Sequence, residues 1–253
     1  MSLPNNKSTR AQSFRIHFFD VARGLCVISM VVFHFCYDLK YLSGFNLIWF
    51  QGIAQNVWRC SISWTFLFIS GIMCALSKNN FRRAIQYGVV ALLVWAVTTI
   101  AAVDKPISFG IIFCIFACTL VAALAEKAGI AAEGPVAAVV LFLAFLCLQG
   151  IQTGQLNILG AKVIVPKGLY STECLAWLGF PGPKFASGDY YPLLPYLFDY
   201  LAGSAMGRWF RGNGWPNWMS GIRFTPLEWI GRHALLIYVL HQPILLAITA
   251  LIG

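Results

Sequence analysis

The sequence contains few charged residues, and acidic residues are especially scarce. Only 11% of its 253 residues are charged, with 9 Asp and Glu against 18 Lys and Arg, whereas soluble domains contain about 25% charged residues. Hydrophobic residues make up 59% of the chain. We therefore expect an integral membrane protein. Its net charge of +9 then reflects the basic bias of cytoplasmic loops, and we expect membrane lipids, not nucleic acid, as partners.

Several chemical motifs are also missing. No GxxxxGK[ST], HExxH or GxSxG pattern occurs, so the usual sequence motifs of nucleotide hydrolases, zinc proteases and serine hydrolases are missing. Apart from Lys40 near the end of the first span, no Lys lies inside an apolar span, which argues against a retinal Schiff base. The 8 cysteines form no CxxC and mostly lie in apolar runs. We read them as small buried residues and expect no metal site.

Apolar spans of about 20 residues, the length that crosses a bilayer as a helix, follow a polar, basic segment at 1–14. The seven spans are 16–42, 57–77, 83–103, 107–125, 135–151, 191–210 and 230–251. We predict an all-α polytopic membrane protein, with residues 1–14 as a cytoplasmic tail and 15–253 as one seven-helix domain. The first apolar run is full length, so we expect no cleavable signal peptide. The distribution of Lys and Arg places the N-terminus inside and the C-terminus outside.

The longest connection, at about 152–190, lies outside in this topology. It is rich in Gly and Pro and contains Trp177, Tyr190 and Tyr191. Loops of this length in compact proteins are usually functional, so it can cap an outer cavity over the end of the first helix. An aromatic belt at the membrane interface explains it equally well.

The first span carries ionisable residues on one helical stripe. Arg23, His34 and Asp38 share a face at about 100° per residue, and ionisable residues inside a bilayer mark candidate functional sites. Asp38 is one turn beyond His34 and can orient it as a general base. Alternatively, His34 is neutral and packs between helices while Asp38 lies in interfacial water. Arg23 either pairs with Asp20 or faces a phosphate from the cytoplasm.

Other spans contribute polar residues at membrane depth. Arg59 begins the second span and faces Asp38, faces an anionic acceptor, or extends to the interface. Asp199 in the sixth span requires a partner, for which Arg59 and His241 are candidates. In the last span, Tyr238 and His241 share a face, and the proline two residues later is expected to loosen the helix.

The start of the sixth span has its own pattern. Asp189 precedes Pro192 and Pro195, which predict a kink or an unwound first turn. Backbone exposed at membrane depth is tolerated only where it lines protein or water, so Asp189 is a candidate for the border of an acceptor site. Gly203 and Gly207 form a GxxxG that permits close helix packing.

Arginines gather at the expected cytoplasmic ends of the spans. They are Arg82, Arg83, Arg208, Arg211, Arg223 and Arg232. Anionic lipid headgroups account for such a surface. A phosphorylated cytosolic donor such as a coenzyme A thioester would be attracted to it as well.

Five motifs in order resemble the bacterial branch of the heparan-α-glucosaminide N-acetyltransferase catalytic-domain family. They are 19–24 (FDVARG) with 30–39 (MVVFHFCYDL), 66–71 (FLFISG), 109–112 (FGII), 189–195 (DYYPLLP), and 231–233 (GRH) with 238–243 (YVLHQP). The resemblance covers residues 16 to about 246. It implies a multi-pass acyltransferase of the bacterial inner membrane, in which acetyl-CoA is the acyl donor and an amine or hydroxyl of a sugar-containing acceptor outside the cytoplasm receives the acetyl group.

The resemblance also assigns residues. His34 matches the family's first-helix His, and Arg23 matches the preceding Arg-Gly. Bacterial relatives often have a His where this chain has Phe113, and the loop at 43–58 lacks the His that accepts acetyl in the lysosomal member. If the chain is an enzyme, His34 or His241 must do the work.

A second hypothesis uses the same polar residues differently. A proton-coupled transporter or lipid-binding membrane protein would employ His34 and Asp38 as a proton relay. Thermal stabilisation by acetyl-CoA distinguishes the two classes. The sequence does not specify the identity of the acceptor, nor whether the protein is a monomer or a homo-oligomer.

Overall fold

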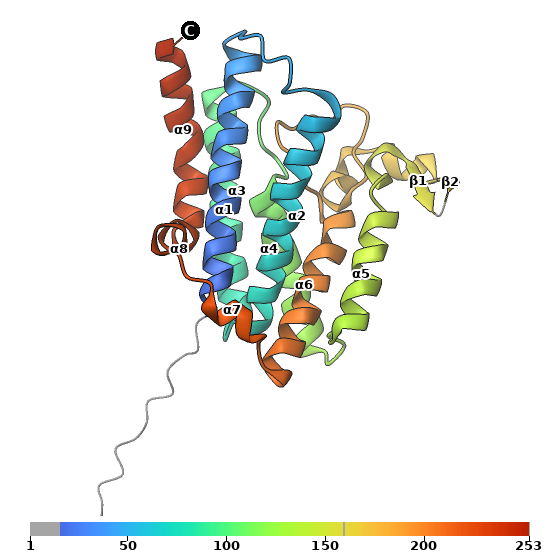
Figure 1. Ribbon diagram of the computed structural model, residues 1–253. Coiled ribbons are helices and arrows are strands. Elements are labelled where there is room, and N and C mark those ends of the chain that lie inside the picture. Colours follow the sequence, from blue (N-terminus) through green and yellow to red (C-terminus); the bar gives the residue numbers. More distant parts are fainter. Residues whose placement is uncertain (1–15, 159, 253) are drawn as a thin grey trace, which may run out of the picture.

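The structure is a computed structural model that describes residues 16–158 and 160–252, so the expected tail at 1–14 lies outside the described residues. Figure 1 shows a helical bundle with one small hairpin at its edge. The long helices are α1 (His17–Tyr37), α2 (Gly52–Leu76), α3 (Asn80–Ala101), α4 (Ile111–Lys127), α5 (Pro135–Cys147), α6 (Leu193–Asn213) and α9 (Ala234–Ile252). The all-α polytopic class is therefore confirmed.

Five of these helices are long and apolar enough to cross a membrane by themselves: α1 with the following π-turn Asp38–Leu42, α2, α3, α5 with the following turn, and α9. The other two, α4 and α6, run alongside them in the same bundle (Figure 1). α4 has 17 residues, and α6 carries an Asp and two Arg residues. Tertiary packing therefore places in the bundle two helices whose own composition is marginal for a span.

The two ends of the bundle are named after α1, as the His17 end and the Asp38 end. The short helices α7 (Asn217–Gly221) and α8 (Thr225–Arg232) lie toward the His17 end (Figure 1). The seventh span was expected to run unbroken from 230, but the helix breaks at His233, between α8 and α9. α9 continues as a helix through Pro243, and because proline has no N–H to donate, the expected local loosening beside His241 stays a prediction.

Close backbone packing joins α2 and α6, as the GxxxG predicts. A Cβ on Gly203 would lie 2.0 Å from the Phe68 carbonyl oxygen, and one on Gly71 would lie 2.0 Å from the Tyr200 carbonyl oxygen. Only glycine fits at these positions, and the two backbones meet directly. Tyr200 is fully buried in the resulting core.

The kink at the start of α6 is confirmed. Pro192 is the N-cap, and Leu194 has non-helical dihedral angles of −97° and 136° inside the helix. The preceding segment pairs with the start of α4, where Tyr191 N–H donates to the Phe109 carbonyl at 2.7 Å. This irregular segment therefore enters the bundle between α4 and α6.

The connection at 152–190 is not a structureless loop. It contains the antiparallel hairpin β1 (Gln155–Ile158) and β2 (Ala161–Ile164), then 3₁₀ turns at Lys167–Tyr170 and Glu173–Leu178. The hairpin was not predicted, and it lies beside α5, at the opposite edge of the bundle from α1 (Figure 1). The expectation that this connection covers the end of α1 is thus wrong for the hairpin, and only its last residues reach the bundle centre.

Candidate active site

A cavity of about 80 Å³ lies between α1, α2, the start of α4, the segment before α6, and the first turns of α9. We call it the polar cavity because six polar side chains interrupt its otherwise apolar lining. Its polar lining residues are His34, Arg59, Ser63, Asp189, Tyr191 and Tyr238. Four of these, namely His34, Arg59, Asp189 and Tyr238, come from the sequence prediction. The volume exceeds the ~10–15 Å³ that one water requires. The structure therefore brings together residues from four separate parts of the chain.

Arg59 lies against Tyr191 in this cavity. Its guanidinium donates to the Tyr191 hydroxyl at 3.2 Å, which leaves the tyrosine hydrogen available for another acceptor. A tyrosine hydroxyl is protonated at neutral pH. Arg59 was expected to face Asp38 or an anionic acceptor. Its partner here is Tyr191, and both groups can donate hydrogen bonds to a bound anion.

Asp189 is held at the N-terminus of α4. One carboxylate oxygen accepts from the Ile111 N–H at 3.3 Å, and the adjacent Ser187 hydroxyl donates to the Asp189 carbonyl at 2.6 Å. Burial raises the pKa of Asp189 to about 6, against the opposing effects of the Ile111 hydrogen bond and the Arg59 charge. Asp189 therefore changes charge near neutral pH.

His34 and His241 form a pair of rings beside the cavity. Their centroids are 4.9 Å apart. The His241 Nδ1 lies 2.6 Å from the Tyr238 carbonyl oxygen, so this nitrogen carries the hydrogen and Nε2 of the neutral ring has a free lone pair. Nε2 is buried without a hydrogen-bond partner among the described residues. The pair thus offers two bases close together in an apolar setting.

Asp38 does not orient His34 directly. Both of its carboxylate oxygens accept from Gln242 Nε2 at 3.0 Å, and the side chain is fully buried. The helical spacing that places His34 and Asp38 on one stripe is real, but a residue from α9 takes the carboxylate. Asp38 therefore fixes α9 next to α1 and acts on His34 only through the helix that carries His241.

Asp199 lacks both of its expected partners. It is fully buried in α6, and neither carboxylate oxygen has a hydrogen-bond partner among the described residues. Arg59 instead bonds Tyr191, and His241 bonds the Tyr238 backbone. The expected pairing of Asp199 with either residue is wrong, because Arg59 and His241 both bond other groups.

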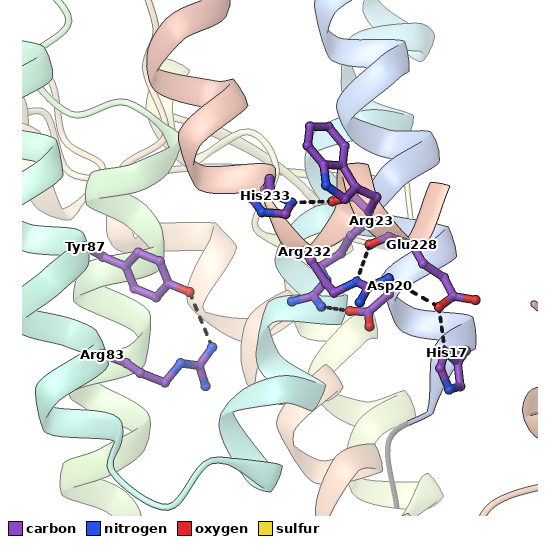
Figure 2. Close-up of polar contacts among 9 residues, drawn as sticks. His17, Asp20, Arg23, Arg83, Tyr87, Glu228, Arg232 and His233 are labelled. Atoms are coloured by element: carbon purple, nitrogen blue, oxygen red, sulfur yellow. Dashed lines mark hydrogen bonds and ion pairs between the residues drawn. The ribbon is translucent and has the colours of Figure 1, made fainter. Parts of the chain in front are cut away.

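The His17 end carries a separate polar cluster (Figure 2). Arg23 pairs with Asp20 on α1, as one of the two sequence alternatives predicted. Glu228 on α8 accepts from His17 at 2.6 Å and lies 3.7 Å from Arg232. The His17 hydrogen bond lowers the pKa of Glu228. These contacts attach α8 to α1, and none of the five residues lines the cavity.

The other predicted arginines largely satisfy helix ends. Arg83 donates to the Met73 carbonyl at 2.9 Å and to Tyr87 at 3.4 Å, as Figure 2 shows for Tyr87. Arg211 donates to the Ala75 carbonyl at 2.8 Å. The last carbonyls of a helix lack partners within it, so these cations complete the end of α2.

Arg82 and Arg208 differ in exposure. Arg208 is buried and donates to the Ala132 carbonyl at 2.9 Å. Arg82 is exposed at the start of α3. Exposed guanidinium groups of Arg82, Arg211 and Arg232 therefore remain at the His17 end.

Two residues, Tyr191 and Gln242, were not predicted from the sequence to belong to the site. Tyr191 lies two residues after Asp189 in the same short motif, and this spacing could have indicated that the two side chains point the same way. Its contact with Arg59 joins distant parts of the chain and could not be read from the motif. Gln242 follows His241 directly and would have been a candidate as a polar residue in an apolar span. Nothing in the sequence connects it to Asp38, which is 204 residues away.

The fold and the cavity define a class: a multi-pass helical membrane protein with basic, acidic and imidazole groups gathered at its centre. The family model of the heparan-alpha-glucosaminide N-acetyltransferase catalytic domain matches residues 15–243. The chain belongs to this family, which implies a membrane acetyltransferase and acetyl-CoA as its donor. No curated protein and no solved structure matches the chain.

Proposed function

We propose that the protein transfers an acetyl group from cytosolic acetyl-CoA to an amine or hydroxyl of a glycan or glycolipid-type acceptor on the other side of the bacterial inner membrane. The observation that supports this proposal is the meeting of His34, Arg59, Asp189 and Tyr191 in one cavity at the bundle centre. In this orientation the His17 end faces the cytoplasm. The cavity then lies between the donor side and the acceptor side.

His34 is the proposed general base. It takes the proton from the acceptor nitrogen or oxygen as that atom attacks the acetyl carbonyl carbon. The carbonyl oxygen becomes an oxyanion, which the Arg59 and Tyr191 donors stabilise. The carbon–sulfur bond then breaks, and the CoA sulfur leaves with a proton from His34. The Nε2 lone pair of His241 has no partner among the described residues, so His241 can accept the proton in place of His34.

The donor's phosphates would be held at the His17 end. Arg82, Arg211 and Arg232 are exposed there, and Arg211 uses one nitrogen for the Ala75 carbonyl, so further N–H donors stay available. A guanidinium is well suited to phosphate oxygens. Arg23, Arg83 and Arg208 face protein partners and would add positive potential at this end.

The test uses inside-out membrane vesicles supplied with acetyl-labelled acetyl-CoA, with label on vesicle acceptors as the readout. We expect His34→Ala to lose transfer by a factor of about 10²–10⁴, the range for a general base. The matched control is His233→Ala, which removes an imidazole that bonds the Trp229 carbonyl away from the cavity. Equal transfer by the His34→Ala variant and the wild type would refute the proposal.

Thermal stability with acetyl-CoA separates this proposal from transport or lipid binding. A donor that binds only the folded state raises the unfolding temperature. We expect stabilisation that weakens in Arg82→Ala and Arg211→Ala and persists in His34→Ala, because His34 is assigned to proton transfer. No stabilisation by any acyl-CoA would favour the transporter hypothesis.

A further inference from the structure

An apolar groove of about 360 Å³ lies on the face of α4 that points away from the polar cavity. Every residue that lines it is hydrophobic. The residues on which the argument depends are Phe109, Phe113, Phe116, Leu120, Trp177 and Leu193. Phe113, the position at which this chain departs from the resemblance, thus belongs to the groove and not to the polar cavity.

The groove follows α4 for the depth of one membrane leaflet. From the start of α4 at Ile111 to Val121, the last lining residue on this helix, the rise of 1.5 Å per residue gives about 15 Å, and half of a ~30 Å hydrocarbon core is also about 15 Å. It starts at the Asp38 end, where Trp177 is 41% exposed at its rim. A tryptophan at this level is typical of the membrane interface.

The groove and the polar cavity share a wall. Ile111 lines the cavity, whereas Phe109 and Phe113, on either side of it along α4, line the groove. The segment before α6 does the same, since Tyr191 lines the cavity and Leu193 lines the groove. This wall is thin at the start of α4, so a molecule whose apolar tail lies in the groove can reach the cavity with a polar head that bends over the Asp38 end of the wall.

The lining decides what fits. A peptide or sugar in the groove would leave its polar groups without hydrogen-bond partners, at a cost of several kcal/mol per group in an apolar setting. A hydrocarbon chain has no such groups and fills the groove by burial alone. The leaflet depth further favours a chain that reaches down from the headgroup region.

We infer that the acetyl acceptor is a lipid, whose polar head enters the cavity and whose acyl or prenyl chain lies in the α4 groove. This rests on the proposed function and narrows its acceptor to a membrane-anchored class. The lipid's hydrocarbon chain would hold the polar head next to His34 and Arg59. Enzyme and acceptor would then both be confined to the membrane when they react.

The first test measures groove occupancy. The protein is reconstituted in vesicles of phosphatidylethanolamine and phosphatidylglycerol that contain a phospholipid with a diazirine in its acyl chain, and crosslinked peptides are mapped. We expect preferential labelling of the α4 face, reduced several-fold by Leu120→Trp, which fills the groove. Phe113→Asn, which makes the groove polar, gives a second variant in case the first does not fold.

The control variant is Leu92→Trp on α3, where the side chain is 66% exposed and outside the groove. We expect its α4 labelling to equal that of the wild type. Labelling of α3 and α4 in simple proportion to exposure, unchanged by both groove variants, would overturn the inference.

The second test follows the product. Vesicles from cells are incubated with acetyl-labelled acetyl-CoA and extracted with organic solvent. We expect the label in the lipid phase, several-fold less of it in Leu120→Trp, and unchanged thermal stabilisation of that variant by acetyl-CoA. Label confined to water-soluble glycans would overturn the lipid acceptor while acetyl transfer stands.

The proposed function fails in a different way. If α4 crosslinks as expected but no acceptor of any kind is labelled, acetyl transfer is refuted. The groove then holds a lipid that is not an acceptor, and the inference falls with the function on which it rests.

Discussion

The charge of Asp189 makes the stability of this protein depend on pH in a defined direction. Burial raises its pKa from 3.8 to about 6, so between these values the folded chain binds more protons than the unfolded chain. Stability then falls as the pH rises. The wild type should be most stable, with respect to this group, below pH 4, and should have lost that contribution above pH 6.

The size of the effect follows from the same two pKa values. Their difference corresponds to about 3 kcal/mol. The carboxylate lines a cavity that is large enough to admit water, and water there would screen part of its charge, so we expect about 2 kcal/mol. For a chain of this size that changes the unfolding temperature by roughly 4–8 °C.

The assay compares Asp189→Asn with the wild type by differential scanning fluorimetry in detergent between pH 4 and pH 7.5. The amide does not titrate, so the difference in unfolding temperature between the variant and the wild type should grow by that amount as the pH rises. Asp104→Asn replaces an exposed carboxylate and is the control. If the Asp189→Asn difference stayed constant over this range, the assignment of a raised pKa to Asp189 would be refuted.

Three further predictions concern packing and the polar contacts between helices. Gly203→Ala places a Cβ against α2 and should cost about 1–3 kcal/mol by overpacking, whereas Gly221→Ala meets nothing within 4 Å and should leave the unfolding temperature unchanged. Gln242→Leu leaves the buried Asp38 carboxylate without its hydrogen bonds and should cost about 1–3 kcal/mol; most of this should return when Asp38→Leu is added, and equal losses in single and double variants would contradict the contact. The pKa of Glu228 is lowered in the folded chain, so its ionised form stabilises the wild type, and this stability is lost on acidification below pH 4.5. Glu228→Gln should lack this contribution and lose less stability over the same pH range. If the variant and the wild type lost the same stability below pH 4.5, this role of Glu228 would be excluded.

The polar stripe of α1 illustrates what local spacing can and cannot specify. Helical periodicity placed His34 and Asp38 on one face, and an ionisable residue in an apolar span indicated a site. The direction in which Asp38 bonds depends on α9, which supplies Gln242. The same holds for Asp199, whose need for a partner was evident but whose expected partners lie in another part of the bundle.

The arginines illustrate a second limit. Their position at span ends was readable from the sequence, and so was the basic character of the surface. Whether each one faces a phosphate or a helix carbonyl depends on which helix end lies beside it. Arg83 and Arg211 complete the end of α2 because α3 begins there and α6 ends there.

Apolar runs, helical spacing and short motifs were enough to predict the membrane environment, the α-helical class, the family and four of the six polar residues that line the cavity. Apolar span length and helical period are local properties that act within 20 residues of chain. Three features depended on tertiary packing: the His34 and His241 rings lie 4.9 Å apart, Arg59 bonds Tyr191, and a groove runs beside the cavity along α4. These contacts join residues far apart in the chain, and which of them form depends on how the close-packed helices are arranged.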